Sequence, residues 1–150
     1  MSKQEIYAWS SLGFTVAIFA YYLIIAFGWP IGMESYAEQI TGLIWKVIGI
    51  TVLVELVLDL LNSTNLGGVQ KDERDVQIAG KGFRNAYYFL MGSIIVLVVH
   101  VLINDFISEA TGETLFLAMP FMIFHVLVFM LFIANIIRSG TQVFYYQWSG

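Results

Sequence analysis

Three ionisable side chains interrupt the apolar run between about residues 40 and 61: Lys46, Glu55 and Asp59. A charge near the centre of a bilayer costs roughly 2.5 to 3.5 kcal/mol, so each must be paired, neutralised or placed at an interface. Lys46 and Glu55 are about 900° apart around a helix, so they face opposite sides and cannot pair. Glu55 and Asp59 lie four residues apart and share a face. Three cations elsewhere in the chain are candidates to neutralise that face: Arg138, Lys71 and Arg84.

Two interpretations of this segment stay open. In the first, Lys46 extends to the outer interface, Asp59 lies at the inner interface, and Glu55 is a structural intramembrane acid. In the second, Glu55 carries a proton or a cation in a small transporter. Because one four-helix unit encloses little polar volume, such a transporter would be a homodimer. Gly13 and Ala17, spaced as a small-xxx-small pair, are a candidate contact for it.

Two histidines are candidate ligands of a b-type haem, because membrane bundles hold such haems between imidazoles on facing helices. They are His100 and His125. The alternative is that each is a polar packing residue bonded to a backbone carbonyl or to Asn104. A divalent-cation site would join a histidine with an acid that follows the third apolar run, namely Asp105, Glu109 or Glu113. We expect no cofactor, with haem b as the alternative.

Sequence motifs for enzymatic chemistry are missing. The chain has no cysteine, which excludes disulfides, thiolate metal sites and cysteine nucleophiles. It also lacks a glycine-rich phosphate loop, a His-Glu-x-x-His motif and a Gly-x-Ser-x-Gly motif. We therefore expect a protein that is not an enzyme.

The elements that must position these residues are membrane helices. Of 150 residues, 59% are hydrophobic and 12% are charged, whereas soluble domains average about 25% charged residues. A helix needs roughly 20 residues to cross a bilayer. Four runs are long enough, at about 7–28, 40–61, 84–104 and 117–137. The sequence thus predicts an all-α integral membrane protein, a single domain of four transmembrane helices over residues 1–150.

The basic residues between the apolar runs predict the orientation of this domain. They lie before the first run, in the connection at about 62–83 and directly after it, and after the fourth run: Lys3, Lys71, Arg74, Lys81, Arg84 and Arg138. The other two connections carry only acids. By the positive-inside rule both termini are cytoplasmic. The expected partners are the lipid bilayer and either a protein partner or a second copy of the chain, and not nucleic acid.

The cytoplasmic connection carries the second group of candidate site residues: Asp72, Glu73, Arg74, Asp75, Lys81 and Arg84. Acids in a first turn stabilise the positive end of the helix dipole, so a helix is expected from Asp75 into the third span. We expect its first turns to lie at the membrane surface. Its basic residues either anchor it to anionic lipid headgroups or, with the acids, form a docking surface for a cytosolic partner.

This connection also carries a family resemblance, through Asp72-Glu73-Arg74-Asp75, Ile78, Lys81-Gly82, Arg84 and Ala86-Tyr87-Tyr88. The pattern resembles a motif in a family of small, uncharacterised bacterial four-span membrane proteins, a domain of unknown function. The polar end of the chain, from Arg138 to Gly150, is similar to the end of those proteins. Members are often encoded beside helix-turn-helix regulators, so the resemblance implies a regulatory or sensory partnership and no catalytic residues. The leading hypothesis is therefore an accessory, sensory or regulatory subunit that docks a partner through residues 72–84. The alternative is a small proton- or cation-coupled transporter centred on Glu55.

Overall fold

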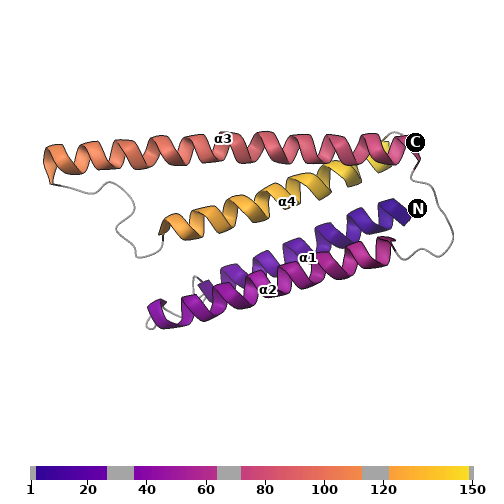
Figure 1. Ribbon diagram of the computed structural model, residues 1–150, viewed down its shortest axis with the longest axis horizontal. Coiled ribbons are helices and arrows are strands. Elements are labelled where there is room, and N and C mark those ends of the chain that lie inside the picture. The colour runs from indigo at the N-terminus through magenta and orange to yellow at the C-terminus, as the bar shows by residue number, and fades with distance from the viewer. Residues whose placement is uncertain (1–2, 27–35, 64–71, 113–121, 149–150) are drawn as a thin grey trace.

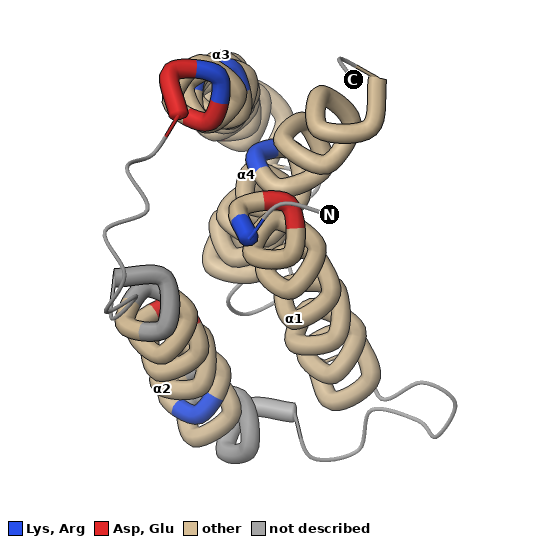
Figure 2. Tube along the Cα trace, turned by 90° about the vertical axis from the view of Figure 1, so that its right-hand side faces the viewer, with Lys and Arg blue, Asp and Glu red and all other residues tan. Residues whose placement is uncertain are grey.

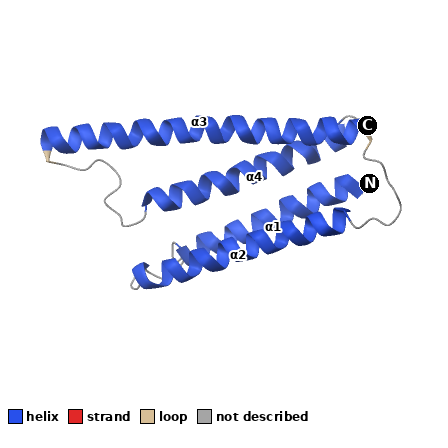
Figure 3. Cartoon of the chain, viewed as in Figure 1, coloured by secondary structure: helices blue, strands red, loops and turns tan. Residues whose placement is uncertain are grey.

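The protein is helical throughout the part that the structure describes. The computed structural model describes residues 3–26, 36–63, 72–112 and 122–148. Every one of these residues except Asp72 and Gly112 lies in an α-helix (Figure 3). The helices are α1 (Lys3–Ala26), α2 (Tyr36–Ser63), α3 (Glu73–Thr111) and α4 (Met122–Trp148). The predicted all-α class is confirmed.

Three of the helices, α1, α3 and α4, are long and apolar enough to cross a membrane. Helices satisfy their own backbone hydrogen bonds, which a spanning segment must do because the hydrocarbon core holds no water. The chain is therefore a multi-pass membrane protein. Most of the large apolar side chains in the second half of α3 are exposed, Val96 by 67% for example, as expected where a helix faces lipid.

The long helix α3 begins at Glu73 and ends at Thr111, so it extends beyond the apolar run at 84–104 at both ends. The expected helix from Asp75 into the third apolar run is confirmed, with a start two residues earlier. Acids in its first turn favour the early start. At the other end Gly112 adopts a φ of 72°, and its N–H donates to the carbonyl of Ser108 at 2.9 Å, which ends the helix. Helix α3 runs from Glu73 to Thr111 without a break (Figure 1), and the position of its first turns at the membrane surface stays a prediction.

The helices pack in the spatial order α3, α4, α1, α2. Helix α4 packs against both α3 and α1, and α2 packs against α1, with its Glu55 side chain in contact with Arg138 of α4 (Figures 1 and 2). The starts of α1 and α3 and the ends of α2 and α4 lie at one end of the bundle (Figure 1). We call this the termini end.

The half of the bundle away from the termini end has an apolar core. Its buried cluster joins α1, α2 and α4 through Tyr22, Ala26, Leu43, Val47 and Phe132. Aromatic rings extend this cluster, with the ring centre of Phe19 5.2 Å from that of Phe132. The half nearer the termini end packs polar side chains between the same three helices.

Helices α3 and α4 are in close contact at Gly82. Ile78, Gly82 and Ala86, spaced by four residues, are the buried residues of α3. A Cβ atom built on Gly82 would lie 2.7 Å from the carbonyl oxygen of Arg138 and 2.9 Å from Cγ of Gln142. This contact needs a residue without a side chain. It fixes the start of α3 against the part of α4 that carries Arg138.

Candidate functional site

The polar half of the bundle is centred on Glu55 of α2. Nη2 of Arg138 lies 3.1 Å from Oε1 and 3.4 Å from Oε2 of Glu55. Asn135 donates from Nδ2 to the same Oε1 at 3.1 Å. The two charged side chains are only 20% exposed for Arg138 and 31% exposed for Glu55. Of the three cations that the sequence offered for this acid, Arg138 makes the pair.

Helix α1 completes the hydrogen bonds around this pair with two buried hydroxyls, Ser11 and Thr15. Asn135 donates to Oγ1 of Thr15 at 3.0 Å, and Arg138 donates to Oγ of Ser11 at 3.4 Å. Ser11 also shares a hydrogen bond of 3.1 Å with the hydroxyl of Ser139. These contacts form one network that links α1, α2 and α4 around the carboxylate of Glu55, as a buried polar group requires.

Helical spacing explains why the network forms. On α4, Asn135, Ser139 and Gln142 are spaced i, i+4 and i+7, so they share the face that meets α1 and α3. On α1, Ser11 and Thr15 are one turn apart and both buried. Our sequence analysis missed these residues. The signal that could have found them is this spacing of polar residues inside apolar runs.

A cavity of about 420 Å³ lies beside the ion pair, and all four helices contribute to its wall. Its charged groups are Glu55, Arg138 and Asp75. On α3, Val76, Ala79 and Phe83 form an apolar part of the wall. A polar cavity of this volume is large enough to hold a small organic molecule.

Asp75 lines this cavity. The sequence had placed it on the exposed docking surface of residues 72–84. Its side chain is half-buried and lines the cavity. The hydroxyl of Tyr146 donates to Oδ1 of Asp75 at 2.9 Å, which joins the start of α3 to the end of α4. The structure therefore brings together Glu55, from α2, and Asp75, from the predicted docking segment, around one cavity.

The other predicted residues of the docking segment lie outside the cavity. Lys81 is half-buried, with Nζ 4.1 Å from the ring centre of Tyr145, a cation–π contact. The remaining ones are exposed: Asp72, Glu73, Arg74 and Arg84. Residues 72–84 thus have an inner face that packs against α4 and lines the cavity, and an outer face that is exposed.

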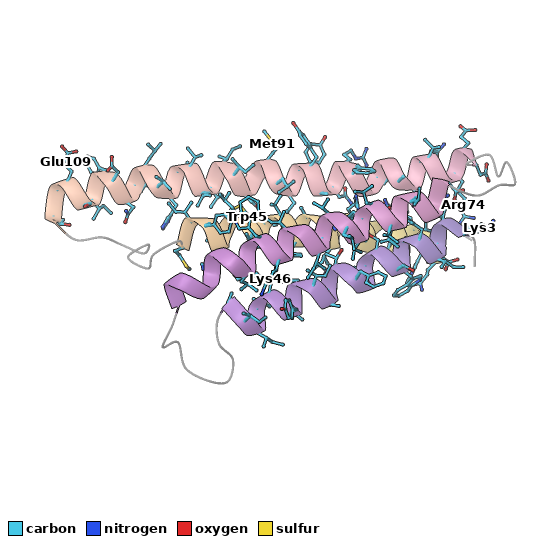
Figure 4. All side chains as sticks on the ribbon, turned by 60° about the horizontal axis from the view of Figure 1, so that its bottom comes forward. Lys3, Trp45, Lys46, Arg74, Met91 and Glu109 are labelled. Atoms are coloured by element: carbon cyan, nitrogen blue, oxygen red, sulfur yellow. The ribbon has the colours of Figure 1, made fainter. Side chains whose placement is uncertain are left out.

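Of the other two candidates of the second helix, Lys46 is not part of the site. Lys46 is exposed (Figure 4), whereas Glu55 is half-buried and pairs with Arg138 of α4. This difference agrees with the expectation that they face opposite sides. The side chain of Asp59 and the residue Lys71 lie outside the part of the chain that the structure describes.

His125, one of the two candidate haem ligands, is buried, and its Nδ1 is hydrogen-bonded to the hydroxyl of Tyr22. A haem iron would therefore have to be bound through Nε2. His100 is half-buried on α3. Haem b stays a prediction. Within residues 3–26, 36–63, 72–112 and 122–148, no three His, Asp or Glu side chains form a group able to hold a metal ion. Glu113 lies outside those residues.

No protein-family model, curated protein or solved structure matches this chain. The resemblance to the four-span family stays a prediction.

Proposed function

We propose that this chain is a non-enzymatic sensory or regulatory subunit of the bacterial inner membrane. In this proposal it spans the membrane four times, with both termini in the cytoplasm. It docks a protein partner through the outer face of residues 72–84.

The fourth span and the orientation are supported by helix length and charge. Helix α2 has 28 residues and packs along α1. At 1.5 Å per residue its length is about 42 Å, enough to cross about 30 Å of hydrocarbon. Lys3 and Arg74 lie at the termini end, and Glu109 lies at the opposite end (Figure 4). This distribution favours a cytoplasmic termini end.

The observation that carries the docking proposal is the two-sided start of α3. On its inner face, Asp75 lines the cavity and Gly82 contacts α4. On the opposite face, Glu73, Gln77 and Arg84 are exposed. Because a helix moves as a rigid rod, a change at the cavity wall would reposition the outer face. One segment can thereby connect an internal site to a docked partner.

We expect charge reversal on the outer face to abolish docking. The variant Arg74→Glu with Arg84→Glu leaves Lys81 in place, because its ammonium packs on Tyr145. The tagged protein is purified in mild detergent from its native membranes, and its partners are quantified against a tag-only control. We predict loss of at least about 90% of the stoichiometric partner, since a like-charge contact is strongly unfavourable. Lys46→Glu, a reversal at another exposed cation, is the matched control and should keep the partner. Equal recovery with the double variant would reject the proposal.

A second candidate function is proton- or cation-coupled transport centred on Glu55. The observation in its favour is that this acid lies at a polar cavity between four helices, paired with Arg138. Intramembrane acids of this kind mark ion pathways in transporters. It predicts pH-dependent flux into proteoliposomes that Glu55→Gln removes. Flux that persists in this variant would exclude Glu55 from the mechanism.

A further inference from the structure

We propose that the cavity beside Glu55 and Asp75 binds a small organic molecule that carries one positive charge. Binding of this ligand would be the signal in the sensory function proposed above. The binding step itself needs neither a docked partner nor transport, so it can be tested alone.

The charges around the cavity favour a monovalent cation. Two carboxylates and one guanidinium line it, which leaves a net charge of −1. Arg138 is 3.1 Å from Glu55 and compensates that acid. Asp75 accepts a hydrogen bond from the neutral hydroxyl of Tyr146, which positions the carboxylate without cancelling its charge. A cation of single charge would balance the cavity, whereas an anion would be repelled.

The remaining wall favours an organic cation over a metal ion. Tyr7, Phe83 and Tyr146 supply aromatic rings, and Val76 and Ala79 supply aliphatic surface. Aromatic faces attract organic cations. The guanidinium carbon of Arg138 already lies 5.4 Å from the ring centre of Phe83. Among the described residues no group of three His, Asp or Glu side chains could hold a metal ion. Two acids within an aromatic and aliphatic wall match an alkylammonium group instead.

The direct test compares choline with its uncharged carbon analogue, 3,3-dimethylbutan-1-ol. Binding of each to the full chain in lipid nanodiscs is measured by isothermal titration calorimetry. The two molecules have nearly the same shape and differ in charge. We predict that choline binds at least about tenfold more tightly, because only the cation meets the carboxylate charge and the aromatic faces. Equal binding of the two molecules, or no binding of choline, would overturn the proposal without the need for any variant.

A pair of variants locates the site. Asp75→Asn keeps the side-chain shape and removes the charge, and we predict at least about tenfold weaker choline binding. Asp105→Asn removes an exposed acid at the other end of the same helix and should leave binding unchanged. Equal choline affinity of the Asp75→Asn variant and the wild-type protein would overturn the assignment. Because this assay contains no partner, its failure would leave the docking result untouched, and failed docking would leave choline binding untouched.

Discussion

Replacing either Glu55 or Arg138 is expected to destabilise the protein far more than the change in side-chain size alone suggests. Glu55→Gln and Arg138→Gln each leave one charge among half-buried partners, and we predict a loss of about 2 kcal/mol in the free energy of unfolding for each. Fully buried pairs lose roughly 3 to 5 kcal/mol when one partner is removed. The smaller value here reflects side chains that are 20% and 31% exposed.

The double variant, Glu55→Gln with Arg138→Gln, distinguishes a direct interaction between the two side chains from two independent losses of a polar residue. With both charges gone, the remaining amides can hydrogen-bond to each other and to Asn135, so the double variant should lose less than the sum of the two single losses. The measurement is reversible unfolding in mixed micelles. Lys46→Gln, at an exposed cation of α2, should change stability by less than about 0.5 kcal/mol. Strict additivity of the two single losses would contradict a direct interaction.

The second large effect is expected at Gly82. In Gly82→Ala the new Cβ would meet the backbone carbonyl of Arg138 at 2.7 Å, closer than the atoms can approach. Helix α3 must therefore move away from α4. We predict a loss of about 1 to 3 kcal/mol, the usual cost of overpacking, although alanine is the better helix former. The same displacement should weaken the hydrogen bond between Tyr146 and Asp75.

Gly92 of the same helix provides the matched control, because a Cβ built there has no atom within 4 Å. In Gly92→Ala only helix propensity changes, so stability should stay the same or rise by up to about 1 kcal/mol. Both variants are measured by the micelle unfolding assay used for the ion pair. If Gly82→Ala and Gly92→Ala change the free energy of unfolding by the same amount, α3 and α4 are not in close contact at Gly82.

The sequence predicted the helices well because apolar run length determines them. The apolar runs at about 7–28 and 117–137 fall mostly within α1 and α4. Hydropathy alone places the start of α3 late, since the charged turns from Glu73 to Arg84 lower its apolar character. The acids of this segment nevertheless predicted a helix from Asp75, two residues from the observed start. The acid at the centre of the site, Glu55, was also found from the sequence. A carboxylate inside an apolar run must be paired, neutralised or placed at an interface, which makes it easy to recognise as a candidate.

The site around Glu55 could not be assembled from the sequence. In a membrane protein both the lipid-facing and the interior faces of a helix are apolar, so hydropathy specifies neither rotation nor neighbour order. The choice of Arg138 over Arg84 as partner depends on that order. The inward turn of Asp75 depends on the contact of Gly82 with α4, which a sequence pattern does not reveal.

Site-specific photo-crosslinking tests the central claim, docking through the outer face of α3, most directly. A photoreactive phenylalanine derivative replaces Gln77, which is exposed on that face, and the cells that carry the chain naturally are irradiated intact. The same derivative at Leu102, exposed by 64% in the apolar part of α3, is the control. We predict one defined protein adduct from position 77 and none from position 102. No adduct from position 77, or the same adduct from both positions, would contradict docking at this surface.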